Sequence, residues 1–126
     1  MTILDTVTTR TSKATEAAIA VERINGPLLL FSGKDDQLWP SDIFCARIVG
    51  RLKARRFTHP VEHYSFELAG HQIGRPFVPT SDVRQTRIHP VSKRAIMVGG
   101  TPDGQARANE ESWARLVTFL DLYLKQ

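Results

Sequence analysis

The stretch Pro27-Leu-Leu-Leu-Phe-Ser-Gly-Lys-Asp-Asp-Gln-Leu-Trp-Pro-Ser41 decides the fold of this chain. It begins with an uninterrupted apolar run, Leu28–Phe31, which a Ser-Gly pair ends. An apolar run without a polar face predicts a strand that is covered on both faces, as in a parallel sheet. Ligands of open α/β sheets bind just beyond the carboxyl ends of such strands. Asp35 and Asp36 stand at that position, so they are the first candidates for chemistry.

The next two segments complete a strand–helix–strand unit. Phe44, Ile48 and Leu52 recur at helical spacing and predict an amphipathic helix from about 42 to 56. Residues Val61–Phe66 alternate moderately in polarity and predict a second strand. A strand, a helix and a strand over this length form a βαβ unit, whose strands run parallel through a right-handed crossover.

The remainder of the chain predicts a long loop and a last helix. Residues 72–98 have no regular period, apart from a brief extended piece at Ala95–Val98, and a loop of this length is typical of a functional lid or a disordered segment. Thr101-Pro102 predicts an N-cap followed by proline in the first turn. The helix should run from 102 or 105 to 124 and pack on the sheet, with Trp113 in the core.

Length and composition indicate one domain with a modest core, since the chain has 126 residues. We divide it into a threonine-rich arm at residues 1–17, expected to be mobile, and an α/β region at residues 18–126. No signal peptide and no run of ~20 apolar residues is visible, so we expect no membrane span and a cytoplasmic location. Cys45 is the single cysteine, which excludes an internal disulfide.

The charge is mildly basic, +4 at pH 7, and suits either an ordinary solvated surface or an anionic ligand. The cationic residues of segment 72–98 are Arg75, Arg84, Arg87, Lys93 and Arg94. Because aromatic residues do not interleave with them and no known module is present, we expect no nucleic-acid partner. His59, His63 and His89 lack the spacing of a metal site, and no Gly-rich phosphate loop occurs, so we expect no metal and no cofactor.

Asp36 and His71 follow the two predicted strands. Parallel neighbours lie ~4.8 Å apart, and they end at the same edge of a sheet, so the loops carrying these residues can meet. A carboxylate that orients an imidazole, while the other ring nitrogen faces a nucleophile, is the geometry that acid–base hydrolysis requires. The pattern equally allows Asp35 and Asp36 as turn formers and His71 as a surface histidine.

Three motifs together resemble one known family: the quoted stretch at 27–41, Ala69-Gly70-His71 and Gly99-Gly-Thr-Pro102. They are similar to the C-terminal domain of the acyl-CoA thioester hydrolases and bile acid-CoA:amino acid N-acyltransferases, within the α/β-hydrolase fold, from about residue 18 onward. The resemblance implies a Ser (or Cys), Asp, His triad that acts on acyl-CoA thioesters. By motif it implies Asp36 as the acid and His71 as the base, and it gives Asp35 no role. The basic segment 72–98 would then either meet the phosphates of coenzyme A or remain a solvated loop.

One part of the family pattern is absent from this sequence. Members carry the nucleophile on a Gly-x-Ser-x-Gly or Gly-x-Cys-x-Gly elbow upstream of the acid and base, and no such pentapeptide occurs here. Ser32 lies in the strand before the acid, and Cys45 lies on the apolar side of a helix, where a thiol is normally a small buried hydrophobe. Loss of the nucleophile costs about six orders of magnitude in kcat in another triad enzyme. We therefore expect that this chain alone is not an active thioesterase.

Two functions remain open. The first is a partial acyl-CoA thioesterase or acyltransferase that supplies Asp36 and His71, whether as a truncated gene, a split subunit or an excised portion. The second is a non-catalytic remnant or interaction module that keeps a hydrolase-type fold. In both cases the strand at Leu28–Phe31 would lack one neighbour, and an unpaired apolar edge predicts self-association or a nucleophile-bearing partner chain.

Overall fold

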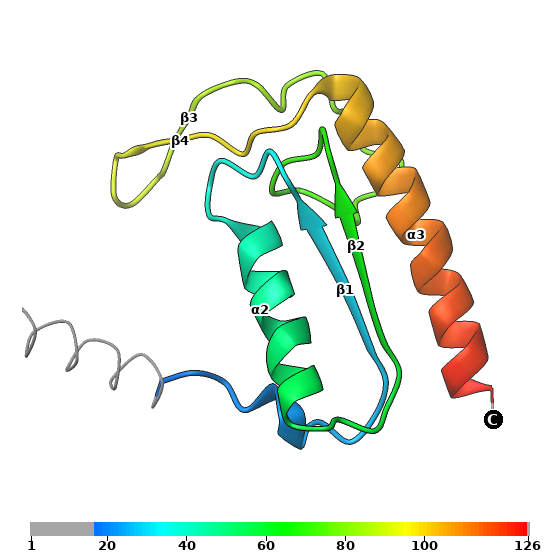
Figure 1. The fold of residues 1–126 in the computed structure, drawn as a ribbon. Coiled ribbons are helices and arrows are strands. Elements are labelled where there is room, and N and C mark those ends of the chain that lie inside the picture. Colours follow the sequence, from blue (N-terminus) through cyan, green and yellow to red (C-terminus); the bar gives the residue numbers. More distant parts are fainter. Residues whose placement is uncertain (1–16, 126) are drawn as a thin grey trace, which may run out of the picture.

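The computed structural model describes residues 17–125 (Figure 1). In chain order its elements are η1 (Val21–Arg23), β1 (Leu28–Gly33), α2 (Ser41–Ala54), β2 (Val61–Phe66), β3 (Arg87–Ile88), β4 (Ala95–Ile96) and α3 (Pro102–Leu124). The arm predicted at residues 1–17 lies outside the described residues except for Ala17. None of the helices between residues 17 and 125 combines the length and the apolar character that crossing a bilayer requires.

β1 and β2 pair in parallel, which confirms the orientation that the apolar run predicts. Leu28 lies opposite Val61 at one end of the pair, and Gly33 lies opposite Phe66 at the other. Both strands therefore end at the same edge, and the loops that follow them start side by side at the top of Figure 1.

The two long helices cover opposite faces of this strand pair (Figure 1). The Ser65 hydroxyl on β2 donates a hydrogen bond to Asp42 of α2. Its neighbour Tyr64 packs instead under Arg115 of α3, whose guanidinium carbon lies 3.7 Å from the centroid of the Tyr64 ring. Successive side chains of a strand point to opposite faces, so the sheet is the middle layer of three.

The predicted helices agree with the structure, apart from their ends. α2 begins at Ser41 and ends at Ala54, with Leu52 as its buried residue. α3 begins at Pro102, directly after the N-cap Thr101, whose side-chain oxygen accepts a hydrogen bond from the Gly104 N–H. This cap confirms the signal at Thr101-Pro102, because a cap of that type satisfies an N–H that the first turn of a helix leaves free.

One prediction was incomplete and one was wrong. β4 lies within the extended piece predicted at Ala95–Val98, but the sequence does not indicate its partner β3, in which Arg87 lies opposite Ile96. Trp113 is 42% exposed instead of lying in the core. The residues of α3 that are buried are Gln105, Ala108, Asn109 and Ser112. Trp113 lies beside that stripe and lines a hollow with Phe77 and Val78 of segment 72–98.

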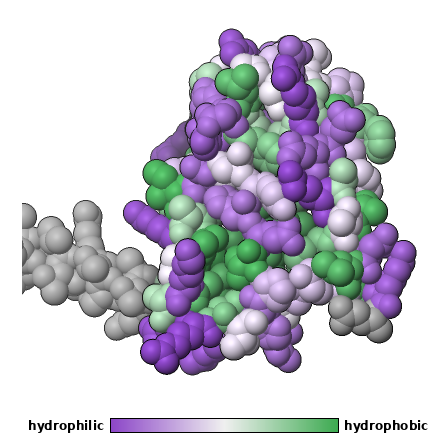
Figure 2. All heavy atoms as spheres, turned by 45° about the vertical axis from the view of Figure 1, so that its right-hand side comes forward, coloured by the Kyte–Doolittle hydropathy of each residue, from purple (hydrophilic) through white to green (hydrophobic). Residues whose placement is uncertain are grey.

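Apolar side chains remain exposed along α3. Those with at least two fifths of their surface accessible are Trp113, Val117, Leu120, Leu122 and Leu124. Figure 2 views the molecule with this side turned forward and shows apolar surface between polar side chains. Few apolar residues of the described chain are buried, and most of them lie near the loops that follow β1 and β2. They are Leu52, Ala69, Val83, Val98 and Ala108.

Candidate active site

Asp36 lies in the loop after β1, and its carboxylate makes two separate sets of contacts. Oδ1 accepts hydrogen bonds from the backbone N–H groups of Leu38, at 3.0 Å, and Trp39, at 3.2 Å. Oδ2 lies 3.1 Å from Nδ1 of His71. The Asp36 side chain is only 1% exposed. One oxygen therefore fixes the turn while the other faces the histidine.

The surroundings of Asp36 favour its ionised form. Burial is the largest single influence and opposes ionisation, because a charge is costly away from water. Hydrogen bonds from Ser41, His71 and the N–H groups of Trp39 and Leu38 together outweigh it and hold the pKa of Asp36 below its ordinary value. The carboxylate is thus negatively charged where it meets the imidazole.

His71 lies in the loop after β2 and is held on several sides. Its backbone N–H donates to the Val98 carbonyl at 2.7 Å. The indole of Trp39 meets the imidazole edge-on, with ring centroids 5.0 Å apart and planes at 82°. The His71 side chain is 29% exposed, and within residues 17–125 its Nε2 makes no hydrogen bond. That nitrogen is free to accept a proton from a group that approaches from outside.

A short segment before α3, Val98–Gly100, crosses over both loops (Figure 1). Gly99 forms a bridge with Asp36, and Gly100 forms one with Ala69. Gly99 and Gly100 have φ of 73° and 86°, which side chains with a Cβ rarely adopt. A Cβ on Gly99 would also lie 1.8 Å from the Asp35 carbonyl oxygen. This segment therefore ties the loop after β1, which we call the acid loop, to the loop after β2, which we call the base loop.

Asp35 makes a structural contact that the sequence around it does not reveal. Its Oδ2 accepts a hydrogen bond from the backbone N–H of Gly100 at 2.9 Å, and its Oδ1 accepts one from Gln37. The two carboxylates are thus not interchangeable: Asp36 faces His71, and Asp35 anchors the crossing segment.

Ser32 and Cys45 are both held away from His71. The Ser32 hydroxyl, in a residue 1% exposed, lies 3.1 Å from Oδ1 of Asp42 and 2.7 Å from Nε2 of His63. The direction of the Ser32–His63 contact depends on which nitrogen of His63 carries the proton, and the burial of Ser32 keeps its hydroxyl away from a substrate. The Cys45 thiol points at the Phe31 carbonyl, 3.8 Å away, and burial, with Asp42 nearby, raises its pKa.

The basic residues of segment 72–98 are spread over the surface. Arg87 pairs with Asp82, while Arg75, Arg84, Lys93 and Arg94 are exposed. Arg84 borders an open hollow of about 350 Å³ beside the site, together with Asp35 and Gly99. Among the described residues no three His, Cys, Asp or Glu side chains come together as metal ligands. Whether this segment meets an anionic substrate or only water stays a prediction.

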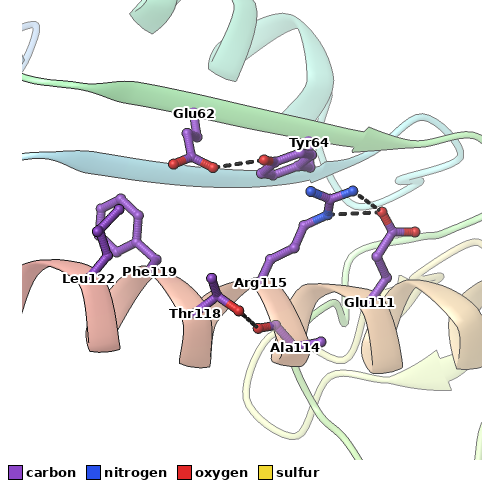
Figure 3. A pocket seen from close by; sticks show the side chains of 8 residues that line it. All are labelled: Glu62, Tyr64, Glu111, Ala114, Arg115, Thr118, Phe119 and Leu122. Carbon is purple, nitrogen blue, oxygen red and sulfur yellow. Dashed lines mark hydrogen bonds and ion pairs between the residues drawn. The ribbon is translucent and has the colours of Figure 1, made fainter.

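A second hollow of about 350 Å³ lies between β2 and α3 (Figure 3). Its polar side chains satisfy one another, since the Tyr64 hydroxyl donates to Glu62 at 2.7 Å and Arg115 pairs with Glu111. Its apolar wall includes Phe119, which projects from α3. Asp36 and His71 do not line this hollow, so it is separate from the acid–base pair.

Comparison with known proteins gives a family match over the whole chain and relatives that match most of it. A family model described as "BAAT / Acyl-CoA thioester hydrolase C terminal" matches residues 1–126. Acyl-coenzyme A thioesterase 6 of Mus musculus is 34% identical over 109 residues, which are 86% of this chain and 25% of that protein. Acyl-coenzyme A amino acid N-acyltransferase 1 of Mus musculus is 29% identical over 108 residues, again 86% and 25%. The chain thus spans about a quarter of the length of these relatives. No solved structure gives a significant match.

Proposed function

This chain belongs to the BAAT / acyl-CoA thioester hydrolase C-terminal family, and on that premise we propose that it supplies Asp36 and His71 as the acid and base of a catalytic triad. The third member, a Ser or Cys, comes from outside the 126 residues of this chain. The substrate class is acyl-CoA thioesters, the class that the names of the relatives indicate for those proteins. The fold is the C-terminal portion of an α/β-hydrolase.

The observation that carries the proposal is the contact between Asp36 and His71. A buried, ionised carboxylate at 3.1 Å from Nδ1 fixes the imidazole with the proton on Nδ1 and stabilises the positive charge that forms on the ring. Nε2 is left as the basic nitrogen. This division of labour supports a base at His71 more directly than any property of the sequence.

In the proposed reaction Nε2 of His71 takes the proton of the nucleophile as that atom bonds to the thioester carbonyl carbon. Asp36 stabilises the resulting imidazolium. The proton then passes to the sulfur of coenzyme A as the carbon–sulfur bond breaks, which leaves an acyl-enzyme. Water or an amine attacks the acyl-enzyme in the same way, giving its proton to His71, and the nucleophile recovers that proton when it leaves.

Three observations support a nucleophile outside this chain. The sequence contains no Gly-x-Ser-x-Gly or Gly-x-Cys-x-Gly elbow, and it spans a quarter of its relatives. Ser32 and Cys45 are bonded elsewhere. The isolated chain is then inactive. The missing elbow also favours the alternative, a non-catalytic remnant or interaction module that keeps the fold.

The free edge of β1 is the surface where the remaining part would join. In the described chain β1 has one strand neighbour, β2. An unpaired strand edge binds another strand readily, so we expect association with a nucleophile-bearing chain or with a second copy. We also propose a cytoplasmic location, whereas two of the relatives are named as peroxisomal and mitochondrial.

A chimera tests the catalytic proposal. Residues 18–126 replace the matching quarter of the Mus musculus thioesterase 6 relative, and release of coenzyme A thiol from an acyl-CoA is measured. We expect His71→Ala to lower kcat by at least about 10⁴-fold, as loss of a triad member does elsewhere. His59→Ala, which removes a histidine outside the site, should leave kcat unchanged. A folded chimera whose rate does not depend on His71 would support the non-catalytic alternative.

A further inference from the structure

The peptide group between Ala69 and Gly70 joins three parts of the molecule. Its carbonyl oxygen accepts a hydrogen bond from the Asp35 N–H at 3.1 Å. Its N–H donates to Oε1 of Gln105, from the first turn of α3, at 2.9 Å. Because a peptide group is planar, these two bonds fix one rigid unit between the acid loop and the helix. That unit lies one residue before His71.

Gln105 is buried and can bond in only one orientation. It is 1% exposed, and its Nε2 donates to Oδ1 of Asn109 at 3.2 Å. A backbone N–H can only donate, so the oxygen of the Gln105 amide must face Gly70. Ala69 and Gly70 are buried as well. A buried N–H without a partner is costly, and no water from the surface can readily replace the glutamine.

The loop around Gly70 has no spare room. A Cβ on Gly70 would lie 2.2 Å from the Val98 carbonyl oxygen, and one on Gly104 would lie 2.4 Å from Cβ of Leu68. The first turn of α3 thus sits directly on the loop that carries His71. In such tight packing a reoriented peptide at Gly70 moves the residue that follows it.

We propose that Gln105 is a positioning residue, which acts through Gly70 to hold the imidazole of His71 in line with Asp36. The inference deepens the proposed function and rests on His71 as its base. Gln105 touches no reacting atom. It sets the direction of the backbone from which His71 projects, and it couples that direction to the Asp35 end of the acid loop.

The experiment compares four ¹⁵N-labelled forms of the 126-residue chain by NMR, without substrate: the unsubstituted chain, Gln105→Leu, Gln105→Glu and Ser112→Ala. Gln105→Leu removes the acceptor and leaves an apolar side chain that ends at Cδ, whereas Gln105→Glu keeps an oxygen for Gly70. Ser112→Ala is the matched control, because Ser112 is equally buried on α3 and bonds only to the Asn109 carbonyl. Two quantities are measured: hydrogen exchange of the Gly70 amide and the tautomer of the His71 ring.

We expect the Gly70 amide to exchange at least about tenfold faster in Gln105→Leu, together with a loss of the single Nδ1-protonated tautomer of His71. Ser112→Ala should stay within about threefold of the unsubstituted chain. Gln105→Glu keeps the acceptor for Gly70 but loses the donor to Asn109, so its Gly70 amide should exchange more slowly than that of Gln105→Leu. A folded Gln105→Leu chain with unchanged His71 tautomer would overturn the proposal. So would rapid Gly70 exchange in the unsubstituted chain, a measurement that remains available if Gln105→Leu does not fold.

These outcomes are separate from those of the catalytic proposal. If the tautomer of the His71 ring changes in Gln105→Leu but the kcat of the chimera does not depend on His71, Gln105 positions a histidine that is not a base. If the kcat of the chimera depends on His71 but Gln105→Leu leaves the tautomer of the His71 ring unchanged, Asp36 and Val98 hold the base without help from α3.

Discussion

The carboxylate of Asp35 accepts a hydrogen bond from the backbone N–H of Gly100, a residue 65 positions further along the chain. The adjacent carboxylate of Asp36 turns the other way, to Nδ1 of His71. Two identical neighbouring side chains therefore make different contacts: one ties the loop after β1 to the segment before α3, and the other meets the imidazole of His71.

This difference predicts unequal effects of two matched substitutions. In the chimera, Asp36→Asn should lower kcat by about 10⁴-fold, because an amide does not hold the imidazole in the required tautomer and does not stabilise its charge. Asp35→Asn retains an oxygen that can accept from Gly100, so kcat should fall by less than about tenfold. Steady-state release of coenzyme A measures both. Equal losses would mean that the assignment of acid and anchor is wrong.

Two glycine-to-alanine substitutions test how tightly the base loop is packed. Gly70→Ala places a Cβ 2.2 Å from the Val98 oxygen, and overpacking of this kind costs about 1–3 kcal/mol in the free energy of unfolding. Gly50→Ala is its counterpart in α2, where nothing lies within 4 Å of the new Cβ. Alanine favours a helix over glycine by up to about 1 kcal/mol. Urea unfolding should therefore shift in opposite directions for the two variants, and a stable Gly70→Ala chain would contradict the packing.

The elements that the sequence predicts well are those with a local pattern of polarity. The apolar run of β1 and the stripe of α2 extend over enough residues for polarity alone to indicate strand and helix. The hairpin of β3 and β4 has two residues in each strand, too few for any alternation to be visible. The buried stripe of α3 is mostly polar, since it consists of Gln105, Ala108, Asn109 and Ser112. Apolar periodicity therefore points to the flank that carries Trp113 and not to the side that is covered.

The residues of the candidate site also divide into those that the sequence predicts and those that it does not. Asp36 and His71 could be proposed from the sequence, because parallel strands end at a common edge and a family motif marks both residues. The supporting contacts of Asp35 and Gln105 are made with Gly100 and Gly70, 65 and 35 positions away. No local pattern indicates such contacts. A glutamine in the first turn of a helix is also an ordinary surface residue by composition, so its burial could not be foreseen.

Acidic pH should lower the free energy of unfolding, because Asp36 becomes protonated. Its pKa is lower in the folded chain than the value of about 3.9 expected when unfolded. The carboxylate therefore stabilises the fold above that value, and the stabilisation disappears as the pH falls through the folded pKa. Urea unfolding between pH 6 and pH 2.5 should show a stability gap between the unsubstituted chain and Asp36→Asn that closes toward the acid end.

A second variant checks the cause of this acid sensitivity. The Ser41 hydroxyl is the strongest of the groups that lower the pKa of Asp36, so Ser41→Ala should raise that pKa and move the acid limb of the stability profile to higher pH. An acid limb that is identical in Ser41→Ala and the unsubstituted chain would mean that another carboxylate controls it.

We predict that the chain associates through the outer edge of β1 and that this association depends on the N–H of one residue, Leu29. The N–H groups of Leu28 and Lys34 donate toward β2, to Pro60 and Phe66. Backbone groups alternate sides along a strand, so the Leu29 N–H points to the free edge. Leu29→Pro should therefore abolish strand addition at this edge while leaving the ladder with β2 intact. Leu30→Pro removes an N–H on the β2 side and should unfold the chain.

Sedimentation of the 126-residue chain over a range of concentrations measures this association. We expect the unsubstituted chain to sediment as a concentration-dependent assembly and Leu29→Pro as a folded monomer, because proline offers no N–H to an added strand. Circular dichroism separates loss of association from loss of folding. If the unsubstituted chain is itself a stable, well-folded monomer, the edge of β1 is not an association site.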